Sequence, residues 1–215
     1  MKIIAISGMM GTGKTTLSSA LAQQTGWTVV REDVTKNQFL GLFYENMDRW
    51  ALASQLSFML NKTLAFERCV KALDEIIIID RTIQEDFYVF GSVLKKYEII
   101  SDAEYQLLEN YYGVLNRSWL PIDLNIYLED TDENCFQRLL NRGDALESKV
   151  EIGYVKSVGE EYRRWRTEFL RAPYYELRSA NVDFRQRQTV EHVLENIRLL
   201  LKLDASQNDS IIASR

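Results

Sequence analysis

Residues 8–15 read GMMGTGKT and match the pattern G-x-x-x-x-G-K-[ST]. In a loop of this kind the backbone amides point inward around a chain of phosphates, and glycine is needed where a side chain would collide or forbid the backbone angles. An apolar run precedes the loop at residues 2–7, and a helical pattern follows it at residues 15–25. This strand–loop–helix context is the one that the motif requires, and the helix adds its positive N-terminus. The sequence therefore predicts a nucleotide phosphate site on an α/β fold.

Two side chains of this segment carry chemistry of their own. The ammonium of Lys14 can reach the outer phosphates of a bound nucleotide, and the hydroxyl of Thr15 can ligate Mg²⁺. The residues expected to bind phosphate are Gly8, Met9, Met10, Gly11, Thr12, Gly13, Lys14, Thr15 and Thr16.

Short apolar runs alternate with longer helical patterns along the rest of the chain. Residues 76–80 read IIIID and are apolar on both faces, as a central strand of a parallel sheet should be. The alternation predicts an α/β fold, a three-layer sandwich with a central five-stranded parallel sheet flanked by helices. Strands are expected at residues 2–7, 28–31, 76–80, 124–129 and 181–184. Helices are expected at about residues 15–25, 48–73, 101–119, 131–142, 154–169 and 190–201.

Length and composition limit the possible classes of protein. The chain has 215 residues, 46% of them hydrophobic, which is ample for a packed core. Because no linker or repeat interrupts it, we expect one domain over residues 1–204 and a disordered tail at 205–215. The net charge of −5 argues against binding to nucleic-acid polymers, since non-specific binding needs an excess of cations.

The small numbers of cysteines and histidines and the shortness of the apolar runs exclude further classes of protein. Cys69 and Cys135 are too few for a disulfide framework or a four-ligand zinc site, and His192 is the single histidine. The apolar run at the start is too short for a signal peptide, and no run approaches the ~20 residues of a membrane helix. We therefore expect a cytoplasmic protein with no membrane partner.

The loop alone does not distinguish a GTP switch from a kinase. A GTPase should carry an Asn-Lys-x-Asp base reader, but residues 61–64 read NKTL. It should also carry Asp-x-x-Gly after the third strand, where residues 80–83 read DRTI. These absences favour phosphoryl transfer to a small acceptor.

Two acidic residues follow strands at the edge where open α/β sheets bind their ligands. Glu32 comes after the second strand, and Asp80 closes the third. Phosphorylation of a hydroxyl benefits from a carboxylate that accepts its proton, from a cation at the transferred group and from a metal. Arg81 is the candidate for the cation.

Several separated segments keep a common order and spacing. They are EDV (32–34), LFYENMDRW (42–50) followed by Gln55, DRTIQED (80–86), and Arg138 and Arg142 followed by Glu147. Over about residues 1–170 this set resembles the deoxynucleoside kinase family, in particular its bacterial deoxyadenosine/deoxyguanosine kinase branch. The resemblance implies phosphorylation of a deoxynucleoside at its 5′-hydroxyl in nucleotide salvage, with ATP or another nucleoside triphosphate as donor and Mg²⁺ as cofactor.

The resemblance also implies roles for the candidate residues. Glu32 would be the general base on the 5′-hydroxyl, Arg81 would hold the transferred phosphate, and Lys14 would complete the catalytic set. Thr15 would bind Mg²⁺ directly, with Asp80 acting through water. Tyr44 and Glu147 would hydrogen-bond the sugar 3′-hydroxyl, and Gln55 and Asp86 would bind the edge of the base. Phe58 and Phe90 would provide apolar or stacking faces for the base. Arg138 and Arg142 would close over the phosphates of the donor. A lid is expected at about residues 138–152, and a homodimer is expected through long helices such as 48–73.

Two positions depart from the family pattern. Asp144 stands where the lid usually has a second arginine, which removes a cation near the transferred phosphate. Lys62 stands where an arginine usually pairs with the base-reading Asp86, and lysine offers a point charge instead of a planar fork. Purine deoxynucleosides are the first choice of acceptor, because DRT…ED is most similar to the purine branch; deoxycytidine stays open.

Two other functions remain as alternatives. A thymidylate-kinase-like nucleoside monophosphate kinase would need an anion site for the acceptor phosphate, for which Arg31 or Arg49 are the candidates. A catalytically silent ATP-binding module would be in keeping with the departure at Asp144.

Overall fold

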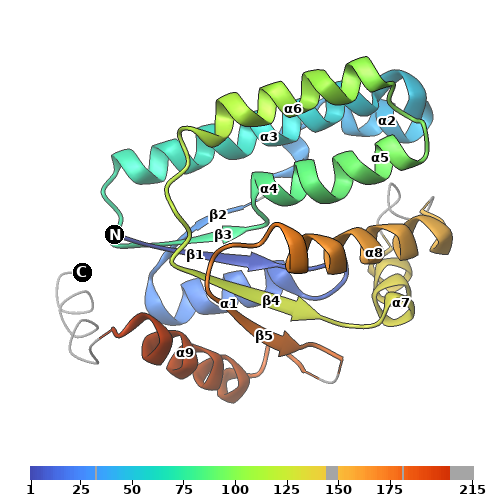
Figure 1. Cartoon of the computed structure of the whole chain (residues 1–215). Helices are drawn as coiled ribbons and strands as arrows, with labels where there is room; N and C mark the ends of the chain where they lie inside the picture. The colour runs from blue at the N-terminus through green and yellow to red at the C-terminus, as the bar shows by residue number, and fades with distance from the viewer. Residues whose placement is uncertain (32, 144–149, 181, 204–215) are drawn as a thin grey trace.

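Parallel strands form the middle of the molecule (Figure 1). The computed structural model describes residues 1–31, 33–143, 150–180 and 182–203. The strands of these residues are β1 (Lys2–Ser7), β2 (Thr28–Val30), β3 (Ile76–Asp80), β4 (Leu124–Glu129) and β5 (Tyr174–Arg178). Their order in the sheet is β2-β3-β1-β4-β5, and all neighbouring pairs are parallel. The prediction of a five-stranded parallel sheet is confirmed.

Helices cover both faces of the sheet and complete the three layers (Figure 1). One face carries α1 (Lys14–Thr25) and α9 (Arg187–Leu201). The opposite side carries α3 (Met47–Lys71), α6 (Asp102–Asn116) and α8 (Ile152–Glu168). The shorter elements are a 3₁₀ turn (Val34–Lys36), α2 (Leu40–Glu45), α4 (Ile83–Glu85), a π-helical turn (Asp86–Gly91), α5 (Ser92–Lys96) and α7 (Asp132–Arg142). No helix of the described chain is long and apolar enough to cross a membrane.

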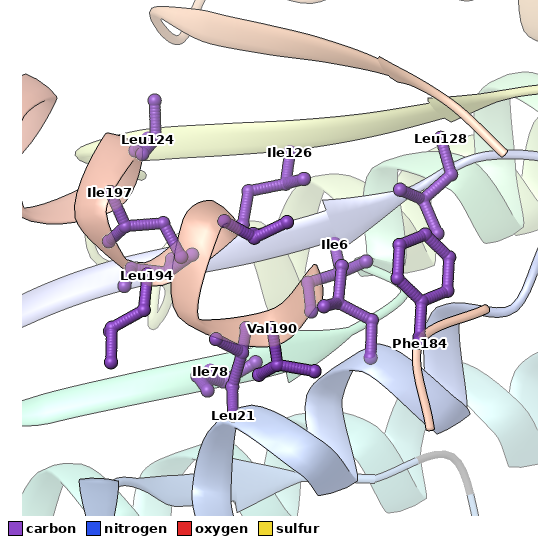
Figure 2. Close-up of a cluster of buried hydrophobic side chains, with 13 residues drawn as sticks. Ile6, Leu21, Ile78, Leu124, Ile126, Leu128, Phe184, Val190, Leu194 and Ile197 are labelled. Atoms are coloured by element: carbon purple, nitrogen blue, oxygen red, sulfur yellow. The ribbon is translucent and has the colours of Figure 1, made fainter. Parts of the chain in front are cut away.

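The core shows why a continuous apolar run is needed in β3. Figure 2 shows Ile6 of β1, Ile126 of β4 and Leu194 of α9 within one cluster of buried apolar side chains. Ile78 of β3 belongs to this same cluster, whereas its neighbour Ile77 is buried in a second cluster on the other face of the sheet. Because both faces are covered by helices, both sets of side chains must be apolar.

The predicted fifth strand at residues 181–184 is wrong. The observed β5 is an edge strand in which alternate residues are exposed, so it has no continuous apolar run. Val182 and Phe184 are apolar for another reason, because their side chains pack in the core beside α9. Residue 181 lies outside the described residues, as do the predicted tail and positions 144–149 of the predicted lid.

The carboxyl ends of β1, β2 and β3 reach one edge of the sheet. Ile6 is in register with Asp80, and Val30 is in register with Ile79. The phosphate loop leaves β1 at this edge and runs directly into α1. Such an edge is where open α/β sheets bind ligands, so the register places the loop beside the end of β3.

Candidate active site

The phosphate loop is shaped by the elements behind it. Gly8, Gly11 and Gly13 have φ values of 135°, 84° and 97°, which side chains rarely adopt. A Cβ on Gly8 would lie 2.3 Å from the carbonyl oxygen of Leu128, and one on Gly11 would lie 2.6 Å from that of Cys135. Gly8 and Gly11 are therefore required by the close approach of β4 and α7, in addition to any contact with a ligand.

Further contacts hold the loop residues in place. Thr12 is buried, and its hydroxyl donates to the carbonyl oxygen of Met9 at 2.8 Å. The side chain of Met9 is buried, that of Met10 is half-buried and that of Thr16 is exposed on the first turn of α1. The ammonium of Lys14 is also buried, and it donates to the carbonyl oxygens of Gly8 and Met9 at 2.6 and 2.8 Å.

Thr15 and Asp80 meet where α1 begins and β3 ends. The hydroxyl of Thr15 donates to Oδ2 of Asp80 at 2.6 Å, and the Asp80 residue is buried. Within the described residues, no group of three or more His, Cys, Asp or Glu is able to hold a metal ion. Mg²⁺ prefers oxygen ligands and is usually held by one or two carboxylates together with substrate phosphates and water. The hydroxyl and carboxylate of this pair fit that requirement.

Arg81 follows Asp80 with an unusual backbone conformation. Its φ is 67°, a value that is uncommon for a residue with a side chain. Its backbone N–H donates to the carbonyl oxygen of Ile6, and its guanidinium lies 4.6 Å from the centre of the Phe90 ring. Phe90 is thus in contact with Arg81, a placement that the sequence did not suggest.

A buried ion pair occupies the predicted base-reading side. Lys62 of α3 donates to both carboxylate oxygens of Asp86 at 2.9 and 2.7 Å, and the two side chains are 1% and 3% exposed. Gln55 is also buried and lies seven residues before Lys62, on the same face of α3. Phe58 is half-buried one turn before Lys62. Phe58 and Lys62 line a pocket together with Arg31, Asp33, Lys36, Asn61 and Ala65.

The structure describes some of the residues that were predicted to bind the sugar. Tyr44 is half-buried on α2, and its ring packs edge-to-face on Phe43. Tyr154 of α8, which the sequence pattern places in a helical apolar stripe, lies near Tyr44. Burial, and then the nearby Tyr44 hydroxyl, raise the pKa of Tyr154 above its usual value. Glu32 and Glu147 lie outside the described residues.

The two predicted lid arginines have different surroundings. Arg138 donates to the carbonyl oxygens of Gly11 and Ser179, each at 3.1 Å, and pairs with buried Asp130 at 2.8 Å. It thereby connects α7 to the backbone of the phosphate loop. Arg142 is exposed and ends α7, where Gly143 takes the left-handed conformation.

The chain is similar to known proteins over almost its whole length. A family model described as deoxynucleoside kinase matches residues 4–202. The chain belongs to the deoxynucleoside kinase family. It is therefore a kinase, a phosphotransferase, and the resemblance drawn from the separated motifs is confirmed.

Similar proteins from several sources agree with this family. The deoxyadenosine/deoxycytidine kinase of Bacillus subtilis is 26% identical over 198 residues, which cover 91% of each chain. A putative deoxynucleoside kinase of Frog virus 3 is 30% identical over 163 residues, covering 75% of this chain and 81% of its own. A solved structure of deoxyadenosine kinase from M. mycoides has a TM-score of 0.80 at 22% identity, over 92% of this chain and 99% of the other. That structural likeness shows the fold.

Proposed function

We propose that this deoxynucleoside kinase transfers the γ-phosphoryl group of ATP to the 5′-hydroxyl of a purine deoxynucleoside in nucleotide salvage. The observation that carries the proposal is the contact of Thr15 with Asp80 directly before Arg81, beside the phosphate loop. A phosphate site, an oxygen pair suited to Mg²⁺ and a cation are thus adjacent. The names of relatives support the purine preference, since they include a deoxyguanosine kinase of Bacillus subtilis and a deoxyadenosine kinase of Dictyostelium discoideum.

The residues divide the reaction between them. The loop amides and Lys14 bind the phosphates, and Thr15 and Asp80 are the residues that would hold Mg²⁺. When bound, Mg²⁺ neutralises charge on the phosphate oxygens. Glu32 accepts the proton of the 5′-hydroxyl as its oxygen attacks the γ-phosphorus and the bond to the leaving ADP breaks. Arg81 stabilises the negative charge on the transferred group.

The base preference is assigned to the buried pair. Asp86 is held by Lys62, and the amide of Gln55 lies on the same face of α3. Because Lys62 presents an ammonium to the carboxylate of Asp86, the pair is less directional than one made with the planar fork of an arginine. Relatives named for purines and one named deoxyadenosine/deoxycytidine kinase share this family, so deoxycytidine is the expected second substrate.

Turnover with ATP and each of the four deoxynucleosides tests this preference. We expect the highest kcat/KM with deoxyadenosine or deoxyguanosine, followed by deoxycytidine and then thymidine. A highest kcat/KM with thymidine or deoxycytidine would contradict the assignment.

We also propose that the kinase acts in the cytoplasm and that it is a homodimer. The interface would be the outer face of α3 and α6, two helices that pack against each other (Figure 1). Leu60 and Leu64 lie one turn apart on α3, and Leu107 and Val114 lie two turns apart on α6. All four side chains are exposed, from 40% for Leu60 to 60% for Val114. Exposed apolar residues on neighbouring helices are typical of protein interfaces.

Light scattering of the purified kinase tests this interface. The parent protein is expected to have the mass of a dimer, and Leu64→Asp is expected to have the mass of a monomer, because a buried unpaired charge opposes association. Leu199→Asp is the control, since Leu199 is exposed on α9, away from α3 and α6. A dimeric Leu64→Asp protein would place the interface elsewhere.

A further inference from the structure

Glu85 is a fully buried carboxylate of α4 that the reaction above does not use. Within the described chain, its Oε2 accepts hydrogen bonds from the hydroxyl of Ser7 at 2.9 Å and from the backbone N–H and hydroxyl of Thr82 at 2.8 and 3.1 Å. Its Oε1 accepts from the backbone N–H of Gly8 at 3.4 Å and the hydroxyl of Tyr162 at 3.1 Å. These donors belong to β1, the phosphate loop, the start of α4, and α8.

Helix capping explains only part of this arrangement. Thr82 and Glu85 form a capping box, in which the third helical residue accepts from the backbone N–H of the cap. Ser101 and Glu104 form the same box at the start of α6, where Ser101 is exposed and Glu104 is half-buried. A cap requires neither full burial nor donors from other elements. The contacts of Glu85 with Ser7, Gly8 and Tyr162 therefore call for another explanation.

The donors around Glu85 are themselves held in place. Asn125 of β4 is buried and donates from Nδ2 to the hydroxyl of Ser7 at 2.9 Å, so that this hydroxyl has its own proton available for Glu85. Burial and the neighbouring charge of Glu85 raise the pKa of Tyr162 well above its usual value, so its phenol remains a donor. A carboxylate, which only accepts, matches such a set of donors.

The hydrogen bonds of Glu85 reach the two segments of the active site that carry the cations Lys14 and Arg81. Gly8 opens the phosphate loop, and its carbonyl oxygen accepts from the ammonium of Lys14 at 2.6 Å. Thr82 directly follows Arg81, whose backbone has the left-handed conformation described above. Glu85 thus binds the backbone of the two segments that carry Lys14 and Arg81.

We propose that Glu85 is a positioning residue for phosphoryl transfer, tying the start of the phosphate loop to the turn that carries Arg81. By holding Gly8 and Thr82 on one carboxylate, it keeps the ammonium of Lys14 and the guanidinium of Arg81 in a fixed relation. The proposal rests on the proposed roles of Lys14 and Arg81.

The variant Glu85→Gln tests this role while keeping the shape of the side chain. Glutamine also serves in a capping box, but one of its ends is an NH₂ group and would face the N–H of Gly8 or of Thr82. Because hydrogen bonds to charged groups are the stronger ones, we expect kcat to fall and the KM for ATP to rise, each about tenfold. The KM for the deoxynucleoside should change by less than about twofold, since the buried Lys62–Asp86 pair is untouched.

The matched control is Glu104→Gln, the same substitution in the less buried capping box of α6, which should leave kcat and both KM values at their parental levels. A variant that had only lost stability would have fewer active molecules and hence a lower kcat, with the KM for ATP unchanged. An unchanged KM for ATP in Glu85→Gln would therefore overturn the proposal.

Two further measurements cover the other outcomes. If Glu85→Gln does not fold, Ser7→Ala removes one donor, and we expect about a threefold rise in the KM for ATP; parental values would overturn the proposal. ATP binding by calorimetry needs no acceptor, so weaker ATP binding by Glu85→Gln would support the positioning role even if deoxynucleosides failed as acceptors. That failure would refute the proposed function alone.

Discussion

Glu32→Gln is expected to lower kcat by about 10²–10⁴-fold and to leave ATP binding close to that of the parent protein. Glutamine has nearly the same shape as glutamate but does not accept the proton that leaves the 5′-hydroxyl. Position 32 comes two residues after β2, whose last residue is in register with Ile79 of β3. The chain therefore leaves β2 at the edge where Asp80 ends β3.

Steady-state kinetics and calorimetry together check this expectation. Glu75→Gln is a suitable control, because Glu75 is an exposed glutamate that precedes β3 at the opposite edge of the sheet. Its kcat should equal that of the parent. Undiminished kcat in Glu32→Gln would refute the assignment of the base.

Lys62→Met is expected to lower the free energy of unfolding by about 3–5 kcal/mol, because it removes an ammonium that donates to the deeply buried carboxylate of Asp86. Lys62→Arg keeps the positive charge and should cost less. Since replacement of both members of a buried pair by apolar residues is often neutral, the double variant Lys62→Met/Asp86→Leu should recover most of the stability. It should not recover the base preference.

Urea unfolding measures these differences, and a surface pair provides the comparison. Lys96 and Glu160 form an ion pair in which both side chains are at least half exposed, so Lys96→Met should cost only about 0–1 kcal/mol. Equal losses in Lys62→Met and Lys96→Met would show that the buried pair contributes no more than a surface pair.

Local signals allowed most of the fold to be predicted. The phosphate loop depends on glycines within eight residues, and β3 has an apolar run because it is covered on both faces. β5 was missed because an edge strand with alternate exposed residues has no such run. The π-helical turn after α4 also has no sequence signal that periodicity detects.

The site was predictable where short motifs carry the chemistry, and less so where the contacts are long-range. The sequence placed Thr15 and Asp80 in the same site, although they are 65 positions apart, because loop and strand end share one edge. In the sequence, Glu85 has the same capping pattern as Glu104 and is not distinguished from an ordinary capping residue. The hydrogen-bond donors of Glu85 at Ser7 and Tyr162 are 78 and 77 positions away in the chain. Such a contact leaves no local pattern.

ADP release with free deoxyadenosine and with dAMP, each measured with ATP and Mg²⁺, tests the central claim most directly. If the 5′-hydroxyl is the acceptor, deoxyadenosine should give turnover with formation of dAMP, and dAMP should give none. Turnover with dAMP and none with any free deoxynucleoside would contradict the account and indicate a nucleoside monophosphate kinase.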